Sequence, residues 1–203
     1  MFRFLLYFSG ILLSSLGIAL FVRADVGVGS GEVFAIGLSL HLPISVGVGY
    51  MTLHLLVVLS NSILGKIIPN PFCIIPIFLR GITVDFWLYI LDPFHPINLV
   101  FRWSLVIIGL LLMGIGLGSY ILSNLPRIPV DDFMYTLAKM TKMKVRTART
   151  TFEVTIAFIG FLLGGPVGLG TVVIALGLGP SVLFFVNLFQ KWYRGVPKPA
   201  KSA

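Results

Sequence analysis

The sequence has 203 residues, of which 57% are hydrophobic and 11% are charged, and its mean hydropathy is +1.02. So few polar residues cannot cover a water-soluble globule of this length, which excludes a soluble domain and indicates a protein of the lipid bilayer. The formal net charge of +8 comes from basic residues beside apolar runs, without any nucleic-acid motif, so it predicts membrane orientation and attraction to anionic lipid headgroups rather than nucleic-acid binding.

Six apolar runs are each long enough to cross a hydrocarbon core, which takes about 20 residues. They are residues 4–22, 45–64, 71–91, 99–122, 146–163 and 167–190. The first run follows Arg3 and resembles a secretory signal, but residues 2–17 match residues 101–116 in mid-chain, so we expect a permanent helix. The fifth run is the weakest, because its apolar part, residues 152–163, is too short without the basic residues before it.

A short amphipathic helix is expected after the first run and another after the fourth. The first follows the glycines of DVGVGSGEVFAIGLSLHLP, and the second follows the prolines of NLPRIPVDDFMYTLAKMTKMK. Glu32 and Asp131 lie near the starts of these helices, where the helix dipole favours an acidic side chain. The pattern is compatible with helices that lie in the interface and with helices that re-enter the membrane.

The two halves of the chain are related by an internal repeat. Shifting the sequence by 99 positions pairs Met1 with Val100 and continues without a gap to Gly65 and Gly164. Of the 64 pairs from residue 2 onwards, 13 are identical, which is roughly a fifth, whereas this composition would give roughly 8% identical pairs by chance. We therefore expect one repeat over residues 1–98, a second over 99–191, and a basic cytoplasmic tail over 192–203.

The lysines and arginines predict the orientation of the chain. If residue 1 is cytoplasmic, the outer side receives only Arg23 and Arg102. The inner side then receives twelve cations: Arg3, Lys66, Arg127, Lys139, Lys142, Lys144, Arg146, Arg149, Lys191, Arg194, Lys198 and Lys201. Both termini are then cytoplasmic. With three crossings each, the repeats enter the membrane from opposite faces, an inverted arrangement common in secondary transporters.

The embedded ionisable residues form the predicted site for a substrate or proton, because such groups inside a membrane are costly and are functional by default. The site comprises His54, Arg80, Asp85 and Glu153, with Glu32 and Asp131 at its mouths. His54 and Glu153 are 99 residues apart, so they occupy the same place in the two repeats.

Each of these residues also has a purely structural explanation. Arg149 precedes Glu153 by four residues and can pair with it on one helix face. His54 can be a neutral histidine bonded to a neighbouring helix, and Arg80 can belong to an internal ion pair rather than anchor an anionic substrate.

Motifs of enzymes and cofactor sites do not match the sequence. There is no HExxH, GxSG or GxGD motif, and the single cysteine, Cys73, excludes a disulfide framework and a multi-cysteine metal site. The segment GGPVGLGT at residues 164–171 lacks the lysine of a phosphate loop, so its glycines predict close backbone approach or exposed helix N-terminal N–H groups. We therefore expect no enzymatic activity, no cofactor and no metal.

Several motifs are distinctive: GIALFVRADVGVGSGEVF in the first half, and PVDDFMYTL, the Arg149–Glu153 pair and LLGGPVGLGTVVIALGLGP in the second. They resemble the YczE membrane proteins of bacteria and the wider YczE/YyaS/YitT group. The resemblance covers residues 10 to 190 or so and is most specific over residues 164–180. Where the family usually has Pro-Trp-Asp, this sequence has Ser30-Gly31-Glu32. The resemblance implies a multi-pass protein of the bacterial plasma membrane without a settled activity.

Two functions fit these observations. The first is a small-molecule or ion transporter whose all-α fold has six transmembrane helices in two inverted three-helix repeats, with a site near the midplane between them. The alternative is an accessory membrane protein that supports a partner complex, as a homo-oligomer or with another membrane protein, through its glycine-rich helix faces. A polar site that binds a small molecule distinguishes the first from the second.

Overall fold

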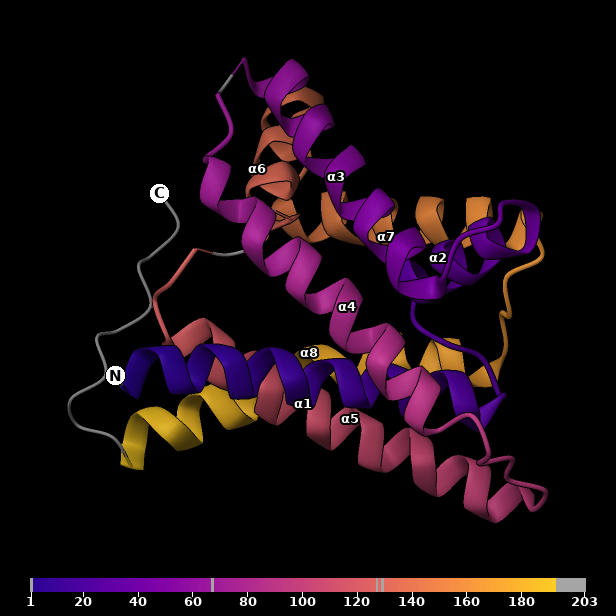
Figure 1. Ribbon diagram of the computed structural model, residues 1–203. Helices are drawn as coiled ribbons and strands as arrows, with labels where there is room; N and C mark the ends of the chain where they lie inside the picture. The colour runs from indigo at the N-terminus through magenta and orange to yellow at the C-terminus, as the bar shows by residue number, and fades with distance from the viewer. Residues whose placement is uncertain (1, 67, 127, 129, 193–203) are drawn as a thin grey trace. The chain divides into compact units, whose positions relative to one another are not determined.

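The computed structural model describes residues 2–66, 68–126, 128 and 130–192, without the side chains of Asp131 and Trp192. Within these residues the chain is all-helical, as predicted, and contains no strand (Figure 1). The helices are α1 (Phe2–Ala24), α2 (Ser30–His41), α3 (Val46–Gly65), α4 (Ile74–Ile90), α5 (Leu99–Leu122), α6 (Val130–Thr141), α7 (Val145–Leu162) and α8 (Leu169–Trp192), with a 3-10 turn, η1, at Pro71–Cys73.

Five described segments are long and apolar enough to cross a membrane: Phe2–Ala24, Val46–Gly65, Pro71–Ile90, Leu99–Leu122 and Leu169–Lys191. They correspond to five of the six predicted spans. The remaining prediction falls on α7, which has 18 residues and includes Arg146, Arg149 and Glu153. Three charges make this helix too polar to qualify by composition, so the six-span count stays a prediction.

The chain divides into two compact units. The first unit comprises Met1–Val28, Thr83–Leu125 and Gly168–Ala203, and therefore contains α1, α5, α8 and the end of α4. The second comprises Gly29–Ile82 and Pro126–Val167, and contains α2, α3, α6, α7, η1 and the start of α4. Each unit draws on residues from both predicted repeats, 1–98 and 99–191.

Short polar side chains set where several helices begin. The hydroxyl of Ser45 accepts a hydrogen bond from the Val48 N–H at 3.2 Å, and α3 starts at the next residue. The side-chain oxygen of Asn98 accepts from the Val100 N–H at 3.0 Å at the start of α5. These contacts satisfy N–H groups that have no partner within the helix.

The helix order repeats along the chain with the spacing found in the sequence. α1, α2, α3 and α4 are a long helix, a short one and two more long ones, and α5, α6, α7 and α8 follow the same order. Asp25, just after α1, has φ of 50°, and Asn124, which is 99 residues later, has φ of 51°. Both repeats therefore leave their first helix through the same left-handed turn, which Asp and Asn tolerate better than most residues.

In the first unit, α1 packs along α5 through glycines (Figure 1). A Cβ on Gly10 would lie 2.7 Å from the Gly116 carbonyl oxygen, and a Cβ on Gly17 would lie 2.7 Å from the Gly109 carbonyl oxygen. The two contact pairs run in opposite directions along the two helices, so α1 and α5 are antiparallel. The helices approach to backbone contact because no side chain separates them at these positions.

The glycines after α7 also allow close approach of two backbone segments, as predicted. In the first unit, the Gly170 N–H donates to the Val26 carbonyl at 2.7 Å, and Gly27, with φ of 106°, lies against Gly168. In the second unit, Gly160 within α7 packs as closely on α2, because a Cβ on it would lie 2.5 Å from the Phe34 nitrogen.

In the second unit, α2 packs on α3 and α7, and α6 packs on α7 and α3. A Cβ on Gly37 of α2 would lie 2.7 Å from the Gly160 carbonyl oxygen in α7. Thr136 and Asn61, which are 99 positions from Gly37 and Gly160, make the matching contact. The Thr136 hydroxyl of α6 donates to Asn61 Oδ1 of α3 at 2.7 Å. Phe133, Met134 and Val57 form a buried apolar cluster beside this bond.

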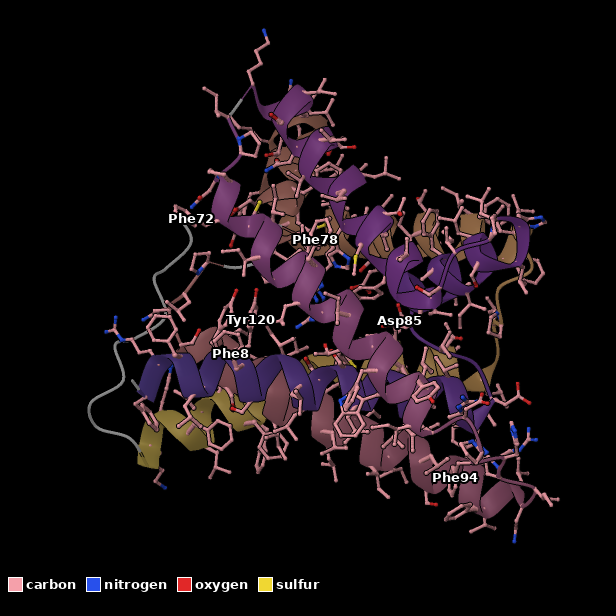
Figure 2. All side chains as sticks on the ribbon, in the orientation of Figure 1. Phe8, Phe72, Phe78, Asp85, Phe94 and Tyr120 are labelled. Carbon is pink, nitrogen blue, oxygen red and sulfur yellow. The ribbon has the colours of Figure 1, made fainter. Side chains whose placement is uncertain are left out.

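Large apolar side chains cover much of the exposed surface of both units. Phe8 projects from α1, Phe72 lies in η1 and Phe78 projects from α4 (Figure 2). Phe72 is 59% exposed, which is costly in water but favourable against lipid tails. This surface agrees with the hydropathy of the helices.

Candidate functional site

The candidate site is a group of four polar side chains buried in the second unit. Glu32 and Arg80 are each 6% exposed, and His54 is 8% exposed. Tyr50, also buried, completes the group. Burying groups that can carry charge costs free energy unless they neutralise one another or bind a ligand.

Small residues bring three helices together around the first turns of α3. A Cβ on Gly31 of α2 would lie 3.4 Å from the Tyr50 ring, and a Cβ on Gly49 would lie 2.6 Å from the Ala35 carbonyl oxygen of α2. From α4, a Cβ on Gly81 would lie 2.8 Å from the Gly47 carbonyl oxygen. Gly31 precedes Glu32 and Gly81 follows Arg80, so both charged residues lie where α2 and α4 approach α3.

His54 is fixed within α3. Its Nδ1 lies 2.8 Å from the Tyr50 carbonyl oxygen, and the Tyr50 and His54 rings are in contact, with centroids 4.4 Å apart and planes inclined by 37°. A carbonyl only accepts hydrogen bonds, so Nδ1 must carry the proton and donate it. In a neutral ring this leaves Nε2 as an acceptor. The sequence was compatible with a hydrogen-bond partner for His54 on a neighbouring helix, whereas its partner, the Tyr50 carbonyl, is one turn earlier in the same helix.

Arg80 provides the positive charge of the group. Its guanidinium hydrogen-bonds the Tyr50 hydroxyl and acts electrostatically on Glu32 and His54. The hydroxyl oxygen accepts this bond, so the Tyr50 O–H remains available as a donor. Tyr50 was not among the predicted site residues, because a tyrosine in an apolar helix usually indicates packing or an interface. Its position four residues before His54 is the signal that would have found it.

Glu32 is the acidic member of the group, and it lies in α2, a 12-residue helix that is too short to span a membrane. Burial raises the pKa of its carboxyl above the ordinary value, against a backbone hydrogen bond and the Arg80 charge, which both lower it. The Glu153 carboxylate adds a smaller upward effect. The sequence predicted Glu32 at the mouth of a site, and the structure buries it within electrostatic reach of Arg80.

Glu153 also belongs to the second unit, but it is less buried. Its Oε1 accepts from Arg149 Nε at 3.1 Å, and its side chain is 38% exposed. The i,i+4 pair expected on this helix face is therefore confirmed. Arg149 and Glu153 occupy the repeat positions of Tyr50 and His54, and both pairs are in contact across one helical turn, through a backbone carbonyl in the first repeat and between side chains in the second.

Two further residues of the predicted site and its mouths are Asp85 and Asp131. Asp85 lies on α4 within the first unit, half-buried, and is visible in Figure 2. Asp131 lies in α6, and its side chain is outside the described residues. The structure thus assembles His54 and Arg80 of the predicted site with Glu32 of the predicted mouth and with Tyr50.

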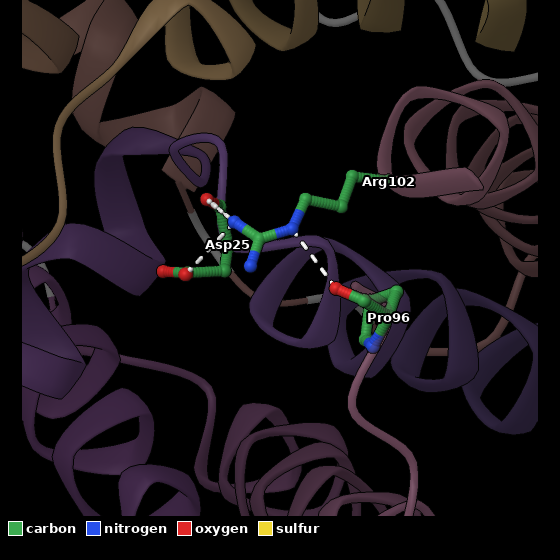
Figure 3. Close-up of polar contacts among 3 residues, drawn as sticks. All are labelled: Asp25, Pro96 and Arg102. Atoms are coloured by element: carbon green, nitrogen blue, oxygen red, sulfur yellow. Dashed lines mark hydrogen bonds and ion pairs between the residues drawn. The ribbon is translucent and has the colours of Figure 1, made fainter. Parts of the chain in front are cut away.

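The first unit has its own polar contacts, which hold helix ends. Arg102 Nη1 lies 3.1 Å from Asp25 Oδ2 and 3.2 Å from the Asp25 carbonyl, and its Nε donates to the Pro96 carbonyl at 3.0 Å (Figure 3). Arg23 donates to Asp92 Oδ1 at 2.8 Å and to the Leu88 carbonyl at 2.7 Å. The two arginines predicted on the outer side therefore both bind a carboxylate and nearby backbone carbonyls.

A further buried polar contact joins α1 to α4 in the first unit. The hydroxyls of Ser15 and Thr83 lie 2.7 Å apart. Among the described residues, no group of three or more His, Cys, Asp or Glu side chains is placed to hold a metal ion.

Residues 1–187 match the model of DUF6198, described as a family of unknown function. The chain belongs to the DUF6198 family. Among curated proteins, it is 27% identical to the uncharacterized protein YyaS of Bacillus subtilis strain 168 over 192 residues, which is 94% of this chain and 96% of YyaS. It is also 27% identical to the uncharacterized membrane protein YczE of the same organism over 185 residues, 90% of this chain and 84% of YczE.

An uncharacterized protein of Haemophilus influenzae is 36% identical over 118 residues, 58% of this chain and 51% of the relative. No solved structure matches the chain. The matches to YyaS and YczE confirm the resemblance drawn from the motifs. Together with the five apolar helices, they make this DUF6198 member a membrane protein that contacts lipid.

Proposed function

We propose that the protein is a small secondary transporter built from two inverted repeats, with its substrate site at the buried group of Glu32, Tyr50, His54 and Arg80. Its termini are cytoplasmic, and the membrane is the bacterial plasma membrane. The observation that carries this proposal is the burial of Arg80 with Glu32 in a chain with five apolar helices of spanning length.

The glycine contacts of α1 and α5 support the inverted arrangement. Gly10 and Gly109 are equivalent in the two repeats, and so are Gly17 and Gly116. Gly10 meets Gly116, and Gly17 meets Gly109, so exchanging the repeats maps one contact onto the other. A two-fold axis between antiparallel helices has this property, and if both helices cross the bilayer the axis lies in the membrane plane.

The second unit supports the same arrangement independently. The Gly37–Gly160 contact between α2 and α7 becomes the Thr136–Asn61 contact between α6 and α3 when the repeats are exchanged. Inverted repeats of this kind carry the substrate sites of many transporters between their halves, often beside short or broken helices. α2, which supplies Glu32, is such a short helix.

The chemistry of the buried group supports binding rather than packing. Packing a core requires only apolar side chains, and an internal ion pair is often no more stabilising than apolar residues of the same volume. Ionisable residues inside membrane proteins therefore indicate a path for a substrate or proton. Tyr50 and His54 add a hydroxyl and a ring nitrogen that can bind a polar ligand.

Ligand binding to the purified protein tests this function. We expect a panel of small anions, amines and amino acids to include a compound that raises the unfolding temperature of the wild type, because a ligand that binds the folded state stabilises it. Arg80→Gln should remove the shift, and Lys139→Gln, an exposed change in α6, should preserve it. The same compound should cross proteoliposome membranes only when the wild-type protein is present.

The accessory function predicts a different outcome. No compound would then shift the unfolding temperature or enter the vesicles, and Arg80→Gln would alter only the stability of the protein. A membrane partner that purifies in a fixed ratio with the wild type would then replace the transporter proposal.

A further inference from the structure

We propose that one end of the second unit is a binding surface for the headgroups of anionic phospholipids. Five exposed cations form this basic surface: Lys66, Lys139, Lys142, Lys144 and Arg146. The sequence predicted only a general attraction of basic residues to anionic lipid, whereas the structure gathers these five at one place. The inference goes beyond the proposed function and does not depend on it, because a transporter and an accessory protein can equally bind lipid here.

The packing of α3 on α6 brings their final residues together (Figure 1). Val57 of α3 packs with Phe133 and Met134 of α6. Further along both helices, Asn61 of α3 binds Thr136 of α6. The two helices therefore run in the same direction, and α3 and α6 finish at the same end of the unit, with a similar rise beyond this bond.

The connection between α6 and α7 lies at the same end. The rings of Phe133 in α6 and Phe152 in α7 are in contact, with centroids 5.5 Å apart, and only residues 142–144 join the two helices, so α7 runs back along α6. The five cations thus come from the end of α3, the last turn of α6, the connection, and the first turn of α7.

The basic surface has no acidic partner of its own. Within the described part of the chain, none of its five cations takes part in an ion pair, and residues 136–152 contain no Asp or Glu. Glu153, the next acidic residue along α7, is bound to Arg149. Like charges gathered without counterions repel one another, so this surface favours an anionic partner.

Helix stabilisation explains only part of this charge. The three lysines at the ends of α3 and α6 lie where the helix dipole favours a cation, but Lys144 and Arg146 lie at the start of α7, where the dipole disfavours one. The Lys144 side chain makes no capping bond, whereas Ser45 caps α3 at the equivalent position of the first repeat. These two cations oppose the local helix, which indicates that an external anion compensates them.

Exposed apolar side chains among the cations favour a lipid headgroup over a soluble anion. Met140 and Met143 are 54% and 47% exposed, and Ile63 in the last turn of α3 is 75% exposed. Apolar side chains that reach acyl chains, beside cations at headgroup level, are typical of surfaces that bind anionic membranes. The equivalent residues of the first repeat, 40–47, contain no lysine or arginine, so only one of the two related turns is basic.

Lipid binding measured at single positions of the purified full chain tests the inference. In a Cys73→Ser background, a fluorescent maleimide on Thr147→Cys reports on the basic surface, and one on Ile97→Cys reports on an exposed position of the first unit. The labelled proteins are reconstituted in phosphatidylcholine vesicles with increasing fractions of brominated phosphatidylglycerol, which quenches the label where it binds. We expect quenching at residue 147 to exceed the value set by the lipid fraction, and quenching at residue 97 to follow that fraction.

Charge variants separate a defined surface from general attraction. Lys144→Gln and Arg146→Gln should each lower the preference for phosphatidylglycerol at residue 147 by up to about fivefold, the contribution of one cation near a membrane surface. Lys144→Arg retains the charge and should retain the preference. Lys191→Gln is the matched control, because it removes an exposed cation from the first unit, and it should leave the preference unchanged.

Quenching at residue 147 that only follows the lipid fraction would overturn the inference, as would equal losses of preference in Lys191→Gln and Arg146→Gln. Displacement of the lipid by inorganic phosphate would assign the surface to a soluble anion and also overturn it. These outcomes leave the transporter proposal untouched, because that proposal is tested by ligand binding at Arg80.

Discussion

Gly10 of α1 lies against the backbone of Gly116 in α5, so that a Cβ on Gly10 would lie 2.7 Å from the Gly116 carbonyl oxygen and 2.8 Å from the Tyr120 nitrogen. Backbone atoms cannot move aside as a flexible side chain can. The contact and its repeat-related counterpart, Gly17 with Gly109, therefore set how closely the two first helices of the repeats approach.

Replacing Gly10 by alanine should separate α1 from α5. We expect Gly10→Ala to destabilise the protein by about 1–3 kcal/mol, the usual cost of overpacking a tight contact. Gly179→Ala in α8 is the matched control, because a Cβ there would meet nothing within 4 Å, and it should be neutral or stabilising. Thermal unfolding in detergent measures both, and equal effects would contradict the role of the α1–α5 contact.

The buried carboxyl of Glu32 should make stability depend on pH. Its pKa is raised in the folded state, so its contribution to stability is fully present below the unfolded value of 4.5 and is lost as the pH rises through the folded pKa. Glu32→Gln removes this dependence, and we expect it to be more stable than the wild type at alkaline pH, with the difference shrinking on acidification. Unfolding temperatures across the pH range check this, and a gain that grows on acidification would refute it.

The hydrogen bond between Thr136 and Asn61 should couple α6 to α3. Thr136→Val leaves Asn61 Oδ1 without this donor, and we expect a loss of about 1 kcal/mol in unfolding free energy. Combining Thr136→Val with Asn61→Ala should cost less than the sum of the single changes, because both remove the same bond. Thr155→Val, which removes only a bond to the Thr151 carbonyl of the same helix, is the control. Strict additivity would show that the bond contributes little.

Cysteine labelling tests whether α7 crosses the membrane. In a Cys73→Ser background, Lys139→Cys lies before α7 and Val167→Cys lies after it, and both positions are exposed. We expect a membrane-impermeant maleimide to label Val167→Cys in intact cells and Lys139→Cys only after permeabilisation, as six spans with cytoplasmic termini require. Labelling of both positions from the same side would show that α7 does not span.

The sequence by itself determined that the protein lies in a lipid bilayer and that its two halves share a repeated sequence pattern. Hydropathy depends on composition over about 20 residues, so five of the six spans predicted from the apolar runs correspond to helices of spanning length without knowledge of their neighbours. The 99-residue offset also anticipated the helix order, because related sequences form the same local structure, down to the left-handed turns at Asp25 and Asn124. The charges of α7 made its assignment the weakest for the same local reason.

Only the tertiary structure decided which polar residues meet. Glu32, Tyr50 and Arg80 lie on three different helices, and these helices approach one another through the packing at Gly31, Gly49 and Gly81. Hydropathy and spacing describe one helix at a time, so they ranked Arg80 with Asp85 on the same helix and left Tyr50 out. The site is set by packing between helices distant in sequence, and it becomes visible when those helices are placed against one another.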